Sequence, residues 1–402
     1  MSCINMIIYV MLFSYFGTRK GVKIVEVYFD NSATTKPYDE VIESMADSMR
    51  EYYGNPSSAY SLGLKAELKM KESREIIANT INCSRDEIIF TSGGSESNNF
   101  LIKGFIESGK HIITTKIEHP SILNTCKQLE KQGVKVTYLN VDDRGEIDLE
   151  ELDASITKET HIVSIMHTNN EIGSLQNIEY IGKYIKERND RIKFHVDAVQ
   201  GYGKYEIDVK KSNIDLLSAS GHKIHGPRGI GIAYIRKGFI PTPLICGGGQ
   251  EKGFRAGTEN LPAIIAFAKA AEKVYKNREG SFNRVNKLKS YFIGKLKDIS
   301  KVKINSEGYN YSPYVLSVSF VGIKGEVLLH LLEEKHIYVS TGSACSARNN
   351  EESHVLKAIG LGKEELDGTI RFSFTEDNSL EEIDYTLDVL VKSLKFLRRV
   401  GR

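Results

Sequence analysis

Residues 214–229 read IDLLSASGHKIHGPRG. An apolar run ends at Ala219, and the next ten residues hold three glycines and one proline. Lys223 lies in this stretch with His222 before it and His225 two residues after it. Most lysines lie on solvated helix faces among other polar residues, so a lysine in a constrained turn indicates a side chain held in place for a purpose. Such amines can act as nucleophiles toward carbonyl groups.

The same succession of apolar run and helical pattern recurs from Glu26 to about Arg236. The runs that predict strands are 87–91, 111–115, 134–140, 161–167, 192–196, 214–219 and 231–235. The amphipathic stretches between them include 40–51, 59–80, 95–108, 120–132 and 178–188. This alternation predicts an α/β fold with a mainly parallel sheet, helices on both faces and right-handed crossovers.

The C-terminal third has a different order of elements. A long helical pattern runs from Leu261 to about Ile299. It is followed by apolar strand candidates and helical patterns at 315–320, 326–334, 337–340, 369–373 and 380–397. We therefore expect a large domain over residues 27–260. We expect a linking helix and a smaller C-terminal α/β domain over residues 261–402.

Residues 1–26 differ from the rest of the chain. Ile4 to Phe16 is mainly apolar, but this run is shorter than the roughly 20 residues of a membrane helix. It has no basic residue before it and no clear small-residue cleavage site, so it does not resemble a signal peptide. We interpret residues 1–26 as an upstream translation start or a disordered extension. A weak membrane-surface anchor is the alternative.

The composition is that of an ordinary globular protein. The chain has 402 residues, of which 41% are hydrophobic and 26% charged, and this length suits two or three domains with a large core. The 54 basic and 52 acidic residues give a net charge of +2. Such a balance provides no overall attraction to nucleic acid or membranes, and we expect neither as a partner.

Five cysteines are widely spaced, at positions 3, 83, 126, 246 and 345. Without a Cys-x-x-Cys pair, they predict neither a zinc site nor a redox dithiol, and we expect no metal site. Free thiols are typical of a reducing compartment, here the cytoplasm. Cys345 differs from the others because it lies in the polar, small-residue stretch STGSACSA at 340–347. We expect a mobile loop there, with the exposure that a reactive thiol requires.

A phosphate site is one interpretation of the stretch FTSGGSESNN at 90–99. A strand ends, two glycines turn the chain, and a helix begins near Gly94 and Ser95. Backbone N–H groups at such a helix start favour an anion, and a serine hydroxyl adds a donor. The alternative is an ordinary strand–turn–helix junction in which Ser95 caps the helix.

Four further polar residues are candidates for a site, and three of them follow predicted strands, where ligands bind in open α/β sheets. Asp197 can pair with a protonated pyridine nitrogen, or it can cap a helix. His119 can stack on a flat ring or act as an acid or base, although a lone histidine is more often structural. Asn170 can donate to a ring oxygen, or it can be a turn residue. Arg371 lies in an apolar strand pattern and requires an anion.

The anion opposite Arg371 can be the carboxylate of an amino acid, which suits a bidentate guanidinium. A structural Asp or Glu is the more common partner of a single arginine. Together, however, these segments supply a phosphate cradle, a pyridinium partner, a ring stacker, a lysine, a thiol and a carboxylate clamp. This combination predicts an enzyme that binds pyridoxal 5'-phosphate.

With these segments in view, the chain resembles the cysteine desulfurases of the NifS/IscS type. They belong to the class V aminotransferase group of the fold-type I pyridoxal phosphate enzymes. The resemblance extends from about Val27 to the C-terminus. Further stretches that carry it are YFDNSATT at 28–35, YGNPSS at 53–58, GGGQE at 247–251 and RAGT at 255–258.

The resemblance implies a role for each site residue. Lys223 forms the Schiff base with pyridoxal phosphate, His119 stacks on its ring, and Asp197 pairs with its ring nitrogen. Gln200 and Asn170 contact the phenolic oxygen. The phosphate group is bound by Gly94, Ser95, Ser220, Gly221 and His222, and by Thr258 from the neighbouring subunit of a homodimer. Arg371 binds the substrate carboxylate, and Cys345 is the nucleophile that becomes a persulfide. His225 has no role.

The implied reaction converts L-cysteine to L-alanine and leaves the sulfur as a persulfide on Cys345. The sulfur acceptors are iron–sulfur cluster scaffolds, with which Cys345 can transiently share a cluster, or enzymes of tRNA and cofactor thiolation. A selenocysteine lyase shares almost every residue and is the nearest alternative. An aminotransferase or epimerase of the same fold, and a non-catalytic sulfur carrier or scaffold subunit, are more distant alternatives.

Two features depart from the family pattern. Residues 1–26 have no counterpart in it. After Arg371, the stretch FTED at 374–377 replaces a turn that usually contains Leu-Gly. The arginine is retained, but the shape of the loop that follows it cannot be carried over from the family.

Overall fold

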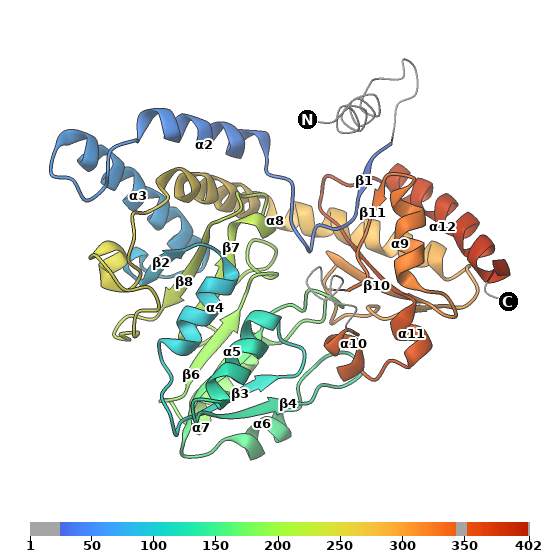
Figure 1. Ribbon diagram of the computed structural model, residues 1–402, viewed down its shortest axis with the longest axis horizontal. Helices are drawn as coiled ribbons and strands as arrows, with labels where there is room; N and C mark the ends of the chain where they lie inside the picture. The colour runs from blue at the N-terminus through green and yellow to red at the C-terminus, as the bar shows by residue number, and fades with distance from the viewer. Residues whose placement is uncertain (1–24, 343–351, 401–402) are drawn as a thin grey trace, which may run out of the picture.

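The computed structural model describes residues 25–342 and 352–400. Its centre is a seven-stranded sheet in the order β2-β8-β7-β6-β5-β3-β4, drawn in Figure 1. The strands are β2 (Ile88–Thr91), β3 (His111–Thr115), β4 (Lys135–Leu139), β5 (Thr160–Met166), β6 (Lys193–Asp197), β7 (Leu216–Ser220) and β8 (Gly231–Ile235). β8 is antiparallel to both of its neighbours, and the other pairs are parallel. The prediction of a mainly parallel sheet is therefore confirmed.

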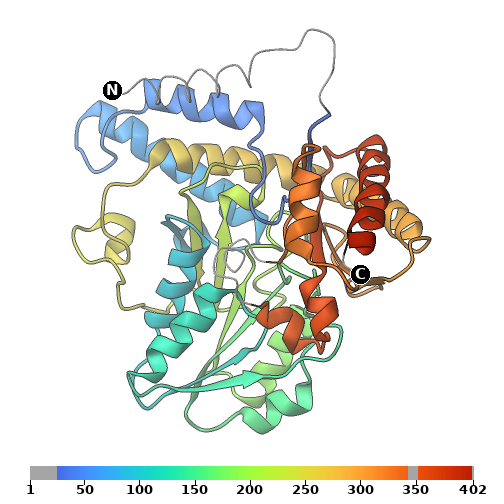
Figure 2. The same ribbon diagram turned by 45° about the vertical axis from the view of Figure 1, so that its right-hand side comes forward.

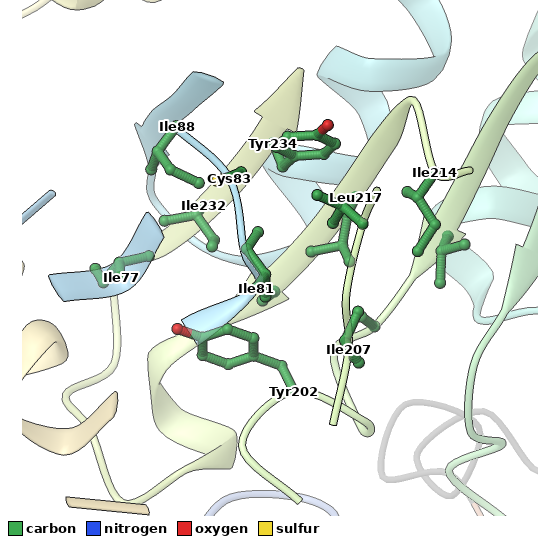
Figure 3. Packing of buried hydrophobic residues seen from close by; sticks show 14 of the residues in the cluster. Ile77, Ile81, Cys83, Ile88, Tyr202, Ile207, Ile214, Leu217, Ile232 and Tyr234 are labelled. Carbon is green, nitrogen blue, oxygen red and sulfur yellow. The ribbon is translucent and has the colours of Figure 1, made fainter. Parts of the chain in front are cut away.

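Alternate residues of each strand face opposite sides of the sheet, and helices cover both sides. Leu217 packs in one core with α3 (Ser61–Thr80), α7 (Ile178–Arg188) and α8 (Leu261–Leu296). Its neighbour Leu216 packs in another core with α4 (Gly94–Lys103) and α5 (Pro120–Glu130). Figure 3 shows part of the first core, where Ile77 of α3 and Ile81 just after this helix lie near Ile232 and Leu217 of the sheet. This two-sided burial explains why the strands read as continuous apolar runs.

The C-terminal part of the chain forms a second layer of sheet and helices. Its antiparallel sheet has the order β12-β10-β9. The strands are β9 (Val302–Ile304), β10 (Val315–Phe320) and β12 (Thr369–Ser373), and α9 (Gly325–Glu333) and α12 (Leu380–Val400) pack with them. The long helix α8 spans both parts of the molecule, as Figures 1 and 2 show. The remaining helices are α2 (Asp39–Glu51), α6 (Leu149–Ser155), α10 (His354–Ala358) and α11 (Lys363–Asp367).

The first described residues join this second layer. β1 (Val27–Tyr28) pairs in parallel with β11 (Ile337–Tyr338), and Phe29 is fully buried against Phe292 and Phe374. The chain then passes the carboxyl edge of the large sheet on its way to α2. Segment 30–35 is thereby held between the two layers.

Three 3-10 turns complete the elements. η1 (Arg85–Glu87) directly precedes β2, η2 (Gly221–Lys223) directly follows β7, and η3 (Gln250–Gly253) lies between β8 and α8. Within residues 25–342 and 352–400, no helix is long and apolar enough to cross a membrane.

Two helical glycines test how tightly the sheet is covered. A Cβ atom on Gly182 of α7 would lie 1.9 Å from the carbonyl oxygen of Ser212, whereas one on Gly280 of α8 would meet no atom within 4 Å. We expect Gly280→Ala to raise the free energy of unfolding by about 0.5–1 kcal/mol, since alanine favours helix. We expect Gly182→Ala to lower it by about 1–3 kcal/mol, the cost of overpacking. Denaturant unfolding measures both, and effects of equal sign would contradict this packing.

Candidate active site

The carboxyl ends of β2, β3, β5, β6 and β7 meet at one edge of the large sheet. A cavity of about 240 Å³ lies at this edge. It is lined by Ser32, Ala33, Gly94, Ser95, Asn98, His119, Ser121, Met166, Thr168, Asn170, Asp197, Val199, Gln200, Ser220, His222, Lys223 and Arg371. Ten of the residues singled out from the sequence are therefore brought together: Gly94, Ser95, His119, Asn170, Asp197, Gln200, Ser220, His222, Lys223 and Arg371.

Lys223 is positioned by a tight turn that follows β7. Gly226 closes this turn: a Cβ atom there would lie 2.7 Å from the carbonyl oxygen of Gly221. The Nζ atom of Lys223 donates hydrogen bonds to the carbonyl oxygens of Ser32 at 2.5 Å and Ala33 at 2.7 Å. The lysine held in place by its turn is thus also held by segment 30–35.

Asp197 is nine-tenths or more buried, and both of its carboxylate oxygens accept hydrogen bonds. Oδ2 accepts from Asn98 Nδ2 at 2.7 Å and Oδ1 from the backbone N–H of Val199 at 3.0 Å. Turns rather than a helix follow it at 199–205, so the alternative that Asp197 caps a helix is wrong. An acceptor-only carboxylate in this place suits a protonated ring nitrogen.

The imidazole of His119 is oriented by hydrogen bonds to its Nδ1 atom. His119 caps α5, with Nδ1 accepting from the backbone N–H of Ser121 at 3.1 Å and lying 2.8 Å from the Ser121 hydroxyl. Asn98 Nδ2 donates to that hydroxyl at 2.8 Å, which leaves the hydroxyl proton for Nδ1. The neutral ring therefore carries its own proton on Nε2. Burial lowers the pKa of His119, although the Asp197 carboxylate acts in the opposite direction.

Asn98 connects these two residues and was not singled out from the sequence. Its amide donates to Asp197 and Ser121, and its Oδ1 accepts from the hydroxyl of Ser218 at 2.5 Å. Asn98 lies one turn after Ser95 on α4. This helical spacing was the one feature of the sequence that could have indicated its place in the site. Ser121 follows His119 by two residues, as in a cap, and that pattern was the clue to its role.

The junction between β2 and α4 places the start of a helix at the cavity. α4 begins at Gly94, after Gly93, whose φ of 150° is a conformation that favours glycine. Ser95 lies inside the first turn rather than at its cap, so the alternative that Ser95 caps the helix is wrong.

Burial, followed by the charges of Lys223 and Arg228, lowers the pKa of His222 to about 3. His222 is therefore a neutral hydrogen-bonding residue at pH 7.

Arg371 is almost fully buried and already has protein partners. Nη2 donates to Asp30 Oδ1 at 2.6 Å and Nη1 to the carbonyl oxygen of Asn170 at 3.0 Å. The structural acidic partner that is common for a single arginine is therefore present. Arg371 Nε is nevertheless buried without a hydrogen-bond partner among the described residues, and Arg371 lines the cavity.

The segment that carries Cys345 starts beside Arg371, but Cys345 itself lies outside the described residues. The backbones of Ser340 and Arg371 exchange hydrogen bonds of 3.2 and 2.6 Å. Glu171, which is buried, contacts both ends of the segment. Its Oε2 accepts from Ser353 Oγ at 2.5 Å and lies 3.5 Å from where a Cβ atom on Gly342 would be. Glu171 was not singled out from the sequence, although it follows Asn170 directly.

Two other predicted residues do not line the cavity. Gly221 is buried in the turn that presents Lys223. Thr258 is exposed on the loop between η3 and α8, and this loop is tied to α4 because Arg255 pairs with Glu96 at 2.9 Å. His225 also has a structural explanation: it stacks on Tyr38 with ring centroids 4.2 Å apart, and its Nδ1 bonds the carbonyl oxygen of Lys36.

The cavity fits pyridoxal phosphate. It offers an amine for a carbonyl, a buried carboxylate for a ring nitrogen, and hydroxyl and N–H groups at a helix start for a phosphate. Two buried polar atoms of lining residues, Ser32 Oγ and Arg371 Nε, have no hydrogen-bond partner in the part of the chain that the structure describes. Such atoms are expected where a polar ligand belongs.

Comparisons with known proteins agree with this chemistry. Residues 27–386 match the family described as aminotransferase class-V. A cysteine desulfurase IscS of Clostridium botulinum is 45% identical over 383 residues, which cover 94% of this chain and 96% of the relative. A cysteine desulfurase IscS of Methanosarcina thermophila is also 45% identical, with 96% of each chain covered.

Solved structures give the same family. A NifS-like protein superposes with a TM-score of 0.88 at 41% identity, covering 93% of this chain and 100% of that one. A structure described as SspA in complex with cysteine superposes with a TM-score of 0.77 at 39% identity, covering 87% of this chain and 99% of that one. The fold, the family and the type of reaction that the sequence predicted are confirmed.

A buried carboxyl group beside the site yields a prediction about stability. Glu118 precedes His119 and is fully buried. Its Oε1 atom accepts hydrogen bonds from the Met166 N–H and the Thr115 hydroxyl. Its Oε2 atom has no hydrogen-bond partner among the described residues. Burial raises the pKa of Glu118 to about 8. The unfolded chain therefore loses this proton first, and the free energy of unfolding falls as pH rises from about 4.3 toward that value.

We expect the uncharged variant Glu118→Gln to remove that part of the pH dependence. Between pH 5 and pH 8 each pH unit costs the wild type up to about 1.4 kcal/mol through this group. Urea unfolding at the two pH values measures the difference. Equal pH dependence in wild type and variant would show that Glu118 is ionised in the folded protein.

Proposed function

Since the chain belongs to the class V aminotransferase family, and within it to the cysteine desulfurases, we propose that it performs this reaction at the described cavity and on Cys345. L-cysteine and the Cys345 thiol are converted to L-alanine and a Cys345 persulfide. The C–S bond of the substrate breaks and an S–S bond forms, so atoms and electrons balance. The observation that carries the proposal is the convergence of Lys223, Asp197, His119 and Arg371 on one cavity.

The residues that would hold pyridoxal phosphate follow from their positions. Lys223 would bind its carbonyl carbon and Asp197 its ring nitrogen. Gly94, Ser95, Ser220 and His222 would hold its phosphate, while Asn170 and Gln200 would contact its phenolic oxygen. When bound, the group supplies an electron sink for the bonds at the substrate's Cα atom.

The remaining chemistry belongs to the side chains. Arg371 binds the substrate carboxylate, for which its Nε is the hydrogen-bond donor that the described residues leave unused. Lys223 Nζ is the base for the Cα proton. His119, whose proton lies on Nε2, donates a hydrogen bond to the substrate sulfur as a thiolate. This orientation makes His119 a proton donor to sulfur rather than the group that first removes the thiol proton.

The Cys345 thiol completes the proposal. Cys345 follows Ser340 by five residues, and the backbone of Ser340 is paired with that of Arg371. The chain that carries the thiol is therefore anchored beside the residue that would hold the substrate carboxylate. We propose an iron–sulfur cluster scaffold or a thiolation enzyme as the acceptor of its sulfur. The free thiols of Cys83, Cys126 and Cys246 support a reducing location, the cytoplasm.

A homodimer is part of the proposal. Large apolar side chains are exposed on and between α2 and α3 and on the segment before Thr258: Ile42, Met49, Tyr53, Tyr60, Leu62, Leu64, Leu68, Ile240, Leu244 and Ile245. Exposed apolar groups of this kind are typical of interfaces. A second copy that covers them would let Thr258 reach the partner's phosphate site.

Two substitutions separate cofactor binding from sulfur transfer. Lys223→Ala is expected to lose the visible absorbance of lysine-bound pyridoxal phosphate and all turnover, because the amine that attaches the cofactor is gone. Cys345→Ala is expected to keep the absorbance and lose the cysteine-dependent release of sulfide in the presence of a reductant. Absorbance spectra and sulfide assays provide both readouts. Full sulfide release by Cys345→Ala would remove this residue from the mechanism, and an unchanged spectrum of Lys223→Ala would remove the lysine.

The dimer is tested with a matched pair of exposed apolar residues. Leu68 of α3 is 56% exposed and Phe396 of α12 is 57% exposed. We expect Leu68→Glu to weaken the dimer at least tenfold because it places a charge in the interface, about 1.4 kcal/mol or more. We expect Phe396→Glu to leave it unchanged. Sedimentation velocity over a concentration series measures both. A monomeric wild type, or equal effects of the two variants, contradicts the proposed interface.

A further inference from the structure

Behind Lys223, on the side away from the substrate cavity, lies a second and much smaller cavity. Its volume of about 20 Å³ is enough for one water molecule. Lys223 lines it together with Lys204, His225, Tyr314 and Glu376. A second lysine, Lys204, therefore borders the same small space as the reactive one. None of the roles assigned so far uses Lys204.

Lys204 is fixed by the turn that follows β6. Gly203 has a φ of 78°, and a Cβ atom on it would lie 2.7 Å from Ile224, the residue after Lys223. The turn thus packs directly against the Lys223 turn, and only glycine allows this approach. Lys204 Nζ lies 5.3 Å from the centroid of the Tyr314 ring, a cation–π contact that stabilises its ammonium group.

The ammonium group of Lys204 determines how the Gln200 amide is oriented. Lys204 Nζ donates to Gln200 Oε1 at 3.1 Å, and Gln200 Nε2 donates to the carbonyl oxygen of Ser32 at 2.9 Å. An ammonium group has donors only, so the amide oxygen must face Lys204 and the amide nitrogen must face the other way. Gln200 lines the substrate cavity. Since Nε2 carries two N–H bonds, one can bond Ser32 and the other can face a ligand.

The same carbonyl oxygen joins Gln200 to the reactive lysine. Ser32 O accepts from Gln200 Nε2 and from Lys223 Nζ. Lys204, Gln200, Ser32 and Lys223 therefore form one continuous series of hydrogen bonds. A change at Lys204 reaches the cofactor site through a single intervening side chain.

We propose that Lys204 is a positioning residue that holds the Gln200 amide with its N–H side toward the phenolic oxygen of pyridoxal phosphate. This inference rests on the proposed function, in which Gln200 contacts that oxygen. Without Lys204 the amide keeps only one of its two protein hydrogen bonds, the one from Nε2 to the Ser32 carbonyl oxygen, so its N–H side is held less firmly. A half turn of the weakened amide would place its oxygen against the phenolic oxygen, and two acceptors repel each other.

The surrounding charges are consistent with a cationic Lys204. Burial lowers its pKa to about 8, with Glu376 acting to raise it and Arg371 to lower it, so it is mainly protonated at pH 7. Tyr38 donates to Glu376 Oε1 at 2.6 Å and keeps this carboxylate in place. Around Lys204 lie several titratable and charged groups. They are His222, Lys223, His225 and Arg228 after β7, Tyr314 before β10, and Arg371, Glu376 and Asp377 at and after β12.

The test is a pH titration of the visible absorbance of lysine-bound pyridoxal phosphate in the holoenzyme. The proton that titrates is shared between the nitrogen of Lys223 and the phenolic oxygen. A donor on that oxygen and a positive charge nearby both favour loss of the proton. We therefore expect Lys204→Met to raise the pKa of the band by about 0.5–1 pH unit, the effect of one lost hydrogen bond. Lys204→Gln serves as the second variant, with a shift in the same direction, should Lys204→Met not fold.

A double-mutant cycle separates positioning from a general effect of charge. In the Gln200→Ala background the shift caused by Lys204→Met is expected to fall to less than half, because the side chain through which Lys204 acts is absent. An equal shift in both backgrounds, or no shift in the protein that retains Gln200, overturns the inference.

The control is another buried lysine. Lys289 is 5% exposed, donates to the carbonyl oxygen of Ser312 at 2.8 Å, and its pKa is lowered to about 7 by burial. Lys289→Met is expected to leave the titration unchanged, and a shift as large as that of Lys204→Met would assign the effect to lost stability. If the wild type shows no such band, the proposed function fails; if it shows the band and Lys204→Met does not move it, only this inference fails.

Discussion

The constraint on which the site depends is the common direction of β2, β3, β5, β6 and β7. Their carboxyl ends lie at one edge, so five connections that are far apart in sequence deliver polar residues to the same place. The apolar cores on both faces of the sheet fix that edge. The C-terminal layer then closes it by placing Arg371 on β12 opposite Asp30. The lining side chains of the cavity thus lie on strands or on the short turns and helix starts that directly follow them.

A single amide organises the middle of this edge. Asn98 holds Asp197, Ser121 and Ser218 at once, and through Ser121 it fixes which nitrogen of His119 carries a proton. Gln200 and Lys204 have a comparable arrangement around Ser32, whose carbonyl oxygen also accepts from Lys223. Two amides at this edge thus have orientations that are set by their neighbours. These hydrogen bonds explain why asparagine, glutamine and serine side chains such as Asn98, Gln200 and Ser218 can be buried there.

The sequence predicted the strands of the large sheet well because their apolar runs are bounded by turn residues. It also predicted the site residues that immediately follow those strands. It did not reveal contacts between distant segments: Arg371 and Asp30 are 341 positions apart, and no local pattern encodes their pairing. The antiparallel direction of β8 was equally hidden, since an apolar run reads alike in either direction. Short helices such as α10 and α11 were missed because one turn carries almost no periodicity.

The pairing of the first described strand with the last part of the chain has a consequence for biosynthesis. Asn31 bonds the carbonyl oxygen of Ser373, 342 positions later, and the Ser32 and Ala33 carbonyls that hold Lys223 lie in the same segment. A ribosome adds about 5–20 residues per second. The segment that holds Lys223 therefore waits tens of seconds for its partner on β12. The described geometry around Lys223 is complete only after nearly the whole chain has been synthesised.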